Sequence, residues 1–211
     1  MTTAAFVLVA MALAAAIVDW IAVVDKDRKL EYLCKPLTIV LLIGVALALE
    51  PESTTMRTWF VSALVFSLAG DVFLMLKERD FFVLGLASFL VAHVAYVLGF
   101  LVGGVGILRL LGGVVVAGVA VVLVGSRIVR AAQESDPQLV VPVMAYMGVI
   151  SVMLAVAIGS GDTAAVAGAV LFYVSDALIG WTKFVHAHTW APLAVIVTYH
   201  LAQIALVTSL A

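Results

Sequence analysis

The sequence has few charged residues and a single cysteine. Asp, Glu, Lys and Arg make up 11% of its 211 residues, whereas they make up about a quarter of an ordinary soluble domain. Cys34 alone excludes a disulfide framework and a cysteine-based zinc site. The formal net charge of -2 provides no basic surface for a phosphate backbone. These shortages exclude a soluble globular domain, a disordered chain and a nucleic-acid-binding protein.

Apolar side chains, in contrast, make up 65% of the sequence. A membrane-spanning helix needs about 20 mostly apolar residues, so the chain has room for eight. No basic residue occurs in Met1–Phe6, which favours a retained first helix over a cleavable signal peptide. We therefore expect a single all-α transmembrane domain, with a short second span that Pro36 opens. The eight expected spans are residues 4–24, 36–49, 58–76, 81–102, 107–124, 139–158, 164–182 and 191–210.

Lysine and arginine are distributed unevenly between the two sides of these spans. The loops after the odd-numbered spans hold nine basic residues, whereas the other side holds Arg57 and Arg109. Positive charge concentrates on the cytoplasmic side of membrane proteins. The expected topology is an integral protein of the cell membrane with both termini extracytoplasmic. The nine residues are Lys26, Arg28, Lys29, Lys35, Lys77, Arg79, Arg127, Arg130 and Lys183.

Landmarks recur at about half the chain length, which indicates an internal duplication. Three pairs of like residues are separated by 106, 105 and 107 positions. Four spans separate the members of each pair, so residues 1–105 and 106–211 would form parallel four-helix repeats. Chance alignment of apolar helices remains the alternative. The pairs are Pro36 with Pro142, Asp71 with Asp176, and His93 with His200.

Four ionisable residues lie well inside the expected spans: Asp71, His93, Asp176 and His200. Each costs about 2.5–3.5 kcal/mol to insert, so such residues usually face a partner or a cavity. Two carboxylates at matching depth indicate function, whereas the histidines also fit a purely hydrogen-bonding role. Asp19 is nearer a helix end and is interpreted as structural or interfacial. No helical pair of metal ligands accompanies them, so we expect neither a metal nor another cofactor.

The polar residues fall in one half of the membrane, although they come from six helices, and this predicts a cavity that opens to the cytoplasm. Helical spacing places Phe82, Gly85, Phe89, His93 and Tyr96 on one stripe. Together with the motifs around them, these residues resemble the YhhN-like lysoplasmalogenases. The other matching pieces are Lys35-Pro36, Gly70-Asp71 with Phe73-Leu74-Met75, Tyr146 with Ile150 and Met153, Gly168-Ala169-x-x-Phe172-x-x-Ser175-Asp176, and Tyr199-x-x-Ala202-Gln203.

The resemblance implies eight spans and a catalytic pair, Asp71 and Asp176, that cleaves the vinyl ether bond of a lysophospholipid. Protonation of the vinyl β-carbon gives an oxocarbenium ion, which water captures, and the hemiacetal collapses to an aldehyde and an alcohol. Two carboxyl groups can share the acid and base roles, as in glycoside hydrolysis. The sequence does not distinguish the acid from the base. Residues expected to bind or orient the substrate are Lys35, His93, Tyr96, Tyr146, Ser175, Tyr199 and Gln203, with Lys35 either meeting the phosphate or serving as a positive-inside anchor.

Two other functions stay open from the sequence. Parallel repeats with intramembrane acids also suit a proton-coupled transporter or exporter of a small amphipathic or lipid substrate. A non-catalytic lipid-binding or scaffold protein would bind lipid without turning it over. Release of aldehyde distinguishes the enzyme from both alternatives.

Overall fold

The computed structural model describes residues 1–76 and 79–211, and within this part every regular element is a helix. The expected all-α membrane fold is confirmed, because eight helical segments are long and apolar enough to cross a membrane. Lys77 lies outside the described residues. The elements are α1 (Thr3–Asp25), α2 (Arg28–Ala48), α3 (Thr54–Met75), α4 (Arg79–Gly103), α5 (Ile107–Ala120), the π-helical turn η1 (Val121–Gly125), α6 (Ser126–Ser135), the 3-10 turn η2 (Pro137–Leu139), α7 (Val140–Ser160), α8 (Thr163–Phe184) and α9 (Ala191–Thr208).

Short polar side chains begin four of the helices. Thr2, Asp27, Ser53 and Asp162 each accept a hydrogen bond from a backbone N–H in the first turn of α1, α2, α3 or α8. Such caps satisfy donors that have no partner within the helix. The boundaries of these helices therefore follow from residues at the membrane surface, outside the apolar runs.

The sequence predicts a short second span that Pro36 opens, and this prediction is wrong on both points. α2 starts at Arg28, where Asp27 accepts hydrogen bonds from the backbone N–H groups of Lys29 and Leu30, and Pro36 lies inside the helix. The charged residues of its first two turns conceal this start in a hydropathy pattern. As a result, Lys35 lies seven residues inside the helix, about 10 Å from its beginning.

The fifth span is also longer than expected. α5, η1 and α6 follow one another without a break, so one helical segment runs over Ile107–Ser135. Arg127 and Arg130 consequently lie on α6 and not in a loop. The π-helical turn η1 contains one extra residue and lies where the apolar α5 meets the charged α6. Such turns are rare in α-helices.

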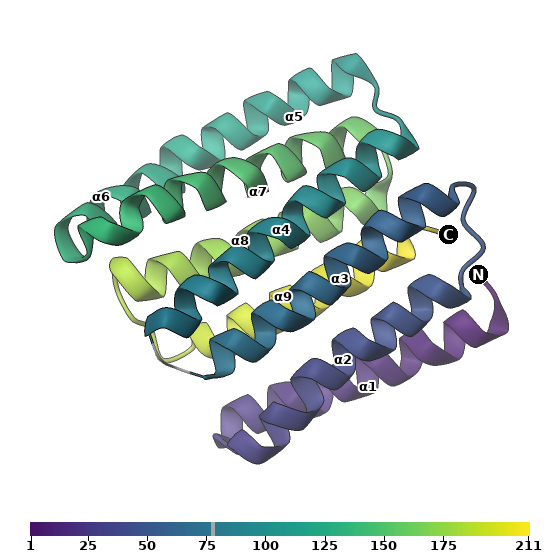
Figure 1. Ribbon diagram of the computed structural model, residues 1–211, viewed down its shortest axis with the longest axis horizontal. Coiled ribbons are helices and arrows are strands. Elements are labelled where there is room, and N and C mark those ends of the chain that lie inside the picture. Colours follow the sequence, from purple (N-terminus) through teal and green to yellow (C-terminus); the bar gives the residue numbers. More distant parts are fainter. Residues whose placement is uncertain (77–78) are drawn as a thin grey trace.

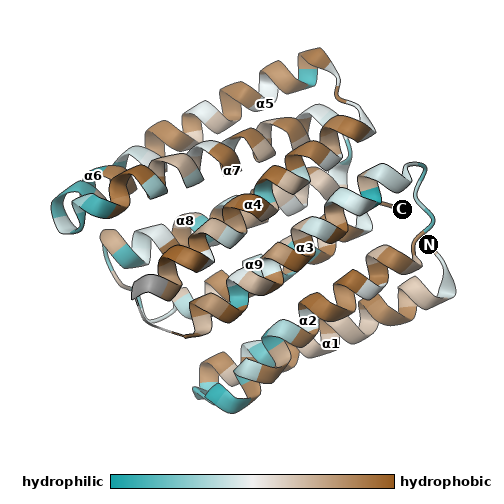
Figure 2. Ribbon diagram, in the orientation of Figure 1, coloured by the Kyte–Doolittle hydropathy of each residue, from teal (hydrophilic) through white to brown (hydrophobic). Residues whose placement is uncertain are grey.

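The helices form antiparallel hairpins that pack into a ring. α2, α3, α4, α7, α8 and α9 each contact the next, and α9 closes the ring against α2. α1 covers α2 and α9 from outside, whereas α5 packs on α7 at the edge of the molecule (Figure 1). Both termini lie at one end, and we call the opposite end, where α1 meets α2 and α8 meets α9, the basic end. Hydrophilic residues gather there on α6 and around the α1–α2 connection (Figure 2).

Candidate functional site

Asp71 is a buried carboxylate on α3 that is held by two other helices. Its Oδ1 lies 3.1 Å from the Nζ of Lys35 on α2, and its Oδ2 accepts a hydrogen bond of 2.7 Å from the hydroxyl of Tyr199 on α9. The Lys35 ammonium also lies 5.9 Å from the centre of the Tyr199 ring. The Lys35 ammonium thus lies at one oxygen of this carboxyl group and the Tyr199 hydroxyl at the other.

Asp176 on α8 has a different environment, without a lysine or arginine partner in the described part of the chain. The Tyr146 hydroxyl of α7 donates a hydrogen bond to its Oδ2. The Nε2 of His93 on α4 lies 3.5 Å from the same oxygen. The His93 Nδ1 lies 2.6 Å from the carbonyl oxygen of Phe89, which can only accept, so Nδ1 carries a hydrogen. In the neutral ring, Nε2 then presents its lone pair towards Asp176.

The two carboxylates line one small internal cavity between α2, α3, α4, α8 and α9. Its volume of about 20 Å³ exceeds the roughly 10–15 Å³ that one water molecule needs. The cavity lining is Lys35, Asp71, Leu74, Phe89, Ser175, Asp176, Ile179, Val195, Ile196 and Tyr199.

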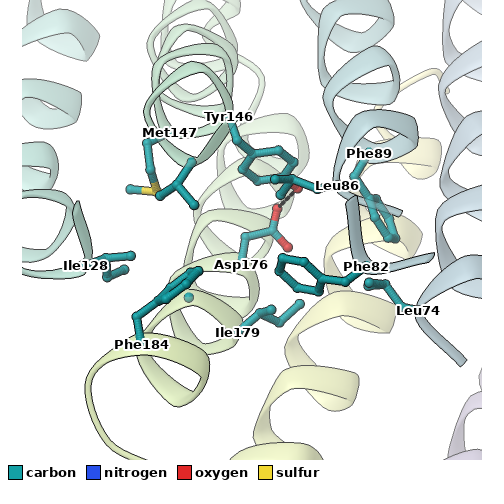
Figure 3. A pocket seen from close by; sticks show the side chains of 12 residues that line it. Leu74, Phe82, Leu86, Phe89, Ile128, Tyr146, Met147, Asp176, Ile179 and Phe184 are labelled. Carbon is teal, nitrogen blue, oxygen red and sulfur yellow. Dashed lines mark hydrogen bonds between the residues drawn. The ribbon is translucent and has the colours of Figure 1, made fainter. Parts of the chain in front are cut away.

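A second, larger cavity of about 50 Å³ begins at Asp176 and extends towards the basic end. Apart from Asp176 and Tyr146, its walls are apolar, and Figure 3 shows the carboxylate pointing among the rings and aliphatic chains that surround it. Asp176 therefore separates an apolar compartment from the smaller polar one. The remaining lining residues are Leu74, Phe82, Leu86, Phe89, Ile128, Val143, Met147, Ile179, Gly180 and Phe184.

Aromatic rings fill the space between the two halves of the site. Phe89, Phe172 and Tyr199 contact one another edge to face, with ring centres 5.5–6.2 Å apart. His93 lies 4.6 Å from the Phe172 ring and 5.3 Å from the Tyr146 ring. Such a cluster is rigid, because each ring packs against the edge of its neighbour. Its negatively polarised ring faces are suited to stabilising a positive charge nearby.

Gly70 brings α3 and α4 close together beside Asp71. A Cβ atom at Gly70 would lie 2.6 Å from the Phe89 ring, closer than real Cβ atoms approach. Gly168 packs in the same way on α9, where a Cβ would lie 2.8–3.0 Å from atoms of Leu206 and Ala202. Both glycines belong to motifs noted in the sequence, and each allows two helices to approach closely.

The other predicted orienting residues lie around this centre. The Ser175 hydroxyl donates to the Val195 carbonyl at 3.0 Å and so joins α8 to α9 beside the smaller cavity. The Tyr96 hydroxyl donates to Gln203 Oε1 at 2.5 Å, joining α4 to α9. Neither Tyr96 nor Gln203 lines either of the two cavities. Their geometry fits support of the helices that carry the site.

A further polar cluster lies between α1 and α9, in a region for which the sequence analysis predicts no site. The Trp20 Nε1 donates to His200 Nδ1 at 3.1 Å. Asp19 is completely buried and is not interfacial, and neither of its oxygens has a hydrogen-bond partner among the described residues. α1 runs on to Asp25, so Asp19 lies six residues, about 9 Å, from the end of the helix.

The partners of the two aspartates come from corresponding helices of the two sequence halves. Asp71 is held by the helix before it, α2, and by α9. Asp176 is held by the helix before it, α7, and by α4. Each carboxylate thus draws one partner from its own half and one from the other. Among the described residues, no group of three potential metal ligands is close enough to hold an ion.

Comparison with known proteins relates most of the chain to one family. The sequence pattern of the YhhN family matches residues 30–210. The chain is 32% identical to lysoplasmalogenase TMEM86B of Mus musculus over 191 residues, which cover 90% of the chain and 79% of the mouse protein. It is 30% identical to lysoplasmalogenase TMEM86B of Homo sapiens over 177 residues, covering 84% of the chain and 74% of the human protein. No solved structure matches the chain.

Proposed function

Because the chain belongs to the YhhN family, we propose that it is a membrane hydrolase that cleaves the vinyl ether bond of lysoplasmalogens to a fatty aldehyde and a glycerophospho-headgroup. Relatives at about 30% identity over most of the chain carry the name lysoplasmalogenase. The observation that carries the proposal is the small cavity that both Asp71 and Asp176 line. It offers two carboxyl groups and room for water at the end of an apolar compartment.

The different partners of the two aspartates suggest different roles. Asp71 is paired with Lys35 and is assigned the ionised form, which activates water. Asp176 lies against the apolar cavity, away from lysine and arginine, and is assigned the protonated form, which donates to the vinyl β-carbon. The Tyr146 hydroxyl hydrogen-bonds Asp176 Oδ2 and stabilises the carboxylate left after proton transfer.

In this mechanism the protons balance over one turnover. Asp176 gives its proton to the β-carbon, and the resulting oxocarbenium ion is stabilised by Asp71 and by the rings of Phe89, Phe172 and Tyr199. Water adds to this ion while Asp71 takes its proton. The hemiacetal then collapses: its hydroxyl proton returns to Asp176, the C–O bond to the glycerol breaks, and Asp71 protonates the leaving oxygen. Both carboxyl groups end in their starting forms.

The test is an assay of the purified protein with a lysoplasmalogen and with the matching acyl lysolipid, in detergent. We expect aldehyde from the vinyl ether lipid and no fatty acid from the acyl lipid, because an ester has no carbon–carbon double bond to protonate. Tight binding of the vinyl ether lipid without aldehyde would overturn the proposal and favour the transporter or the lipid-binding protein. Complete inhibition by a chelator with rescue by zinc would replace the two-carboxylate mechanism with metal chemistry.

A further inference from the structure

Lys183 lies at the rim of the larger cavity, in the last turn of α8. Its Nζ lies 4.0 Å from the centre of the Phe82 ring and 5.7 Å from that of Phe184. Both rings line the cavity that begins at Asp176. The side chain is exposed, so its ammonium group stands where the apolar cavity meets the basic end of the protein.

Lys183 also shares a helix face with Asp176. The two residues are seven positions apart, two turns of an α-helix, and therefore project in nearly the same direction about 10.5 Å apart along the axis. Ile179, Gly180 and Phe184 of α8 line the cavity from the same side. One face of α8 thus presents a carboxyl group at the deep end of the cavity and an ammonium group at its rim.

This spacing matches the distance between the two recognisable groups of a lysoplasmalogen. Seven bonds join the vinyl β-carbon to the phosphorus, and at the roughly 1.2 Å per bond of an extended chain they span about 8 Å. A reacting carbon lies about 3 Å from its proton donor, and a phosphate oxygen about 3 Å from an ammonium nitrogen. A lipid with its vinyl carbon at Asp176 therefore places its phosphate within reach of Lys183.

The charges favour Lys183 over Lys35 for this contact. The Lys35 ammonium is 3.1 Å from Asp71, and its side chain is only 15% exposed, so its charge is engaged inside the protein. Within residues 1–76 and 81–211, no carboxylate pairs with Lys183. On the basis of the lysoplasmalogenase function proposed above, we propose that Lys183 binds the phosphate of the substrate and thereby sets the position of the vinyl ether against Asp176.

The experiment compares two substrates that differ by the phosphate: a choline lysoplasmalogen and the phosphate-free 1-alkenylglycerol. For Lys183→Ala, the KM of the phospholipid should rise roughly tenfold or more, because a charge-assisted hydrogen bond is lost. The KM of the alkenylglycerol should stay unchanged, and Lys183→Arg should retain most of the affinity for the phospholipid. Lys29→Ala removes an exposed charge at the same end of the protein, away from the cavity lining, and should change neither KM.

Equal effects of Lys183→Ala on both substrates, or no effect on either, would overturn the assignment. Binding of a non-hydrolysable 1-alkyl lysophospholipid to the wild type and to Lys183→Ala provides a readout independent of turnover. Weaker binding to the variant supports the phosphate contact even if the wild type releases no aldehyde, in which case the proposed function alone has failed. Identical binding to both proteins refutes the contact.

Discussion

The two aspartates differ most clearly in the residues that hold them. Asp71 has a lysine and a tyrosine at its two oxygens, whereas Asp176 has a tyrosine and a neutral imidazole at one. A pair of identical side chains can thus take two chemical roles in one site. The positions of Lys35 and His93 make that difference, because one brings a positive charge and the other a lone pair.

Replacement of either aspartate by asparagine should therefore slow the reaction strongly. Asp71→Asn and Asp176→Asn should each lower kcat about 100-fold or more, since asparagine keeps the size but neither carries charge nor donates a carboxylic proton. The double variant should be little worse than either single one, because the two groups act as one catalytic unit. Aldehyde release from purified proteins measures these effects.

Asp162→Asn is the matched control on α8. Asp162 accepts a hydrogen bond from the Ala165 backbone N–H at the start of that helix, a role that asparagine also performs. Near-normal turnover by a well-folded Asp176→Asn protein would remove the two-carboxylate mechanism.

The candidate site residues can be predicted from the sequence in part. A carboxylate in an apolar run is costly, and this cost identified Asp71 and Asp176 as candidates for a shared cavity, which the structure contains. The partner of Lys35 was not predictable, because it depends on α2 beginning at Arg28 and carrying Lys35 inwards. The burial of Asp19 was not predictable either, because it depends on the packing of α1 against α2 and α9.

At the scale of elements, close helix contacts fix the walls of the site. α3 and α4 meet at Gly70, where the Phe89 ring occupies the space that a side chain would need. Phe89 cannot retreat freely, because Phe172 and Tyr199 pack against its other edges. The absence of a side chain at Gly70 thus allows the Phe89 ring to pack beside Asp71.

Gly70→Ala should lower both thermal stability and turnover, because the added methyl group forces Phe89 out of the cluster. Overpacking of this kind commonly costs about 1–3 kcal/mol. Gly148→Ala in α7 is the control, since nothing lies within 4 Å of the position its Cβ would occupy. It should leave the protein as stable as before, or more so. Melting temperature in detergent and aldehyde release measure the two effects, and equal behaviour of the two variants would contradict the steric argument.

At the scale of the whole molecule, an even number of spans places both termini at one end. The opposite end carries the lysines and arginines of α2, α6 and α8, and Figure 2 shows hydrophilic residues gathered there. By the positive-inside rule, we expect the basic end to face the cytoplasm and both termini to face outwards. With the proposed function, the larger cavity would then accept lipid from the cytoplasmic leaflet.

A reporter fused at Ala211 tests this topology. A periplasmic alkaline phosphatase should be active there, and a fluorescent protein that matures only in the cytoplasm should be dark. Fusions in the 185–190 connection should give the reverse pattern. A fluorescent fusion at Ala211 would show that the bundle is inserted the other way up.

Each half of the sequence supplies one partner to the aspartate of the other half, and this leads to another expectation. The chain can be divided after Gly104, which follows α4, has a φ of 93° and has no neighbour within 4 Å of a potential Cβ. Residues 1–104 alone and 105–211 alone should release no aldehyde, whereas co-expression should restore turnover. Co-expression with Asp176→Asn in the second piece should not. Full activity of a single piece would refute a site made from both halves.

The partners of the two aspartates are also ordered in time during translation. Asp176 follows Tyr146 and His93, so both reach the membrane before it does. Asp71 precedes Tyr199 by 128 residues, which at about 5–20 residues per second is a delay of roughly 6–26 s. Throughout that interval the nascent chain holds a carboxylate in the bilayer with α9 not yet made. Lys35 is translated 36 residues before Asp71 and is available as its counter-ion throughout this interval. The ion pair therefore stabilises the aspartate whose second partner is translated last.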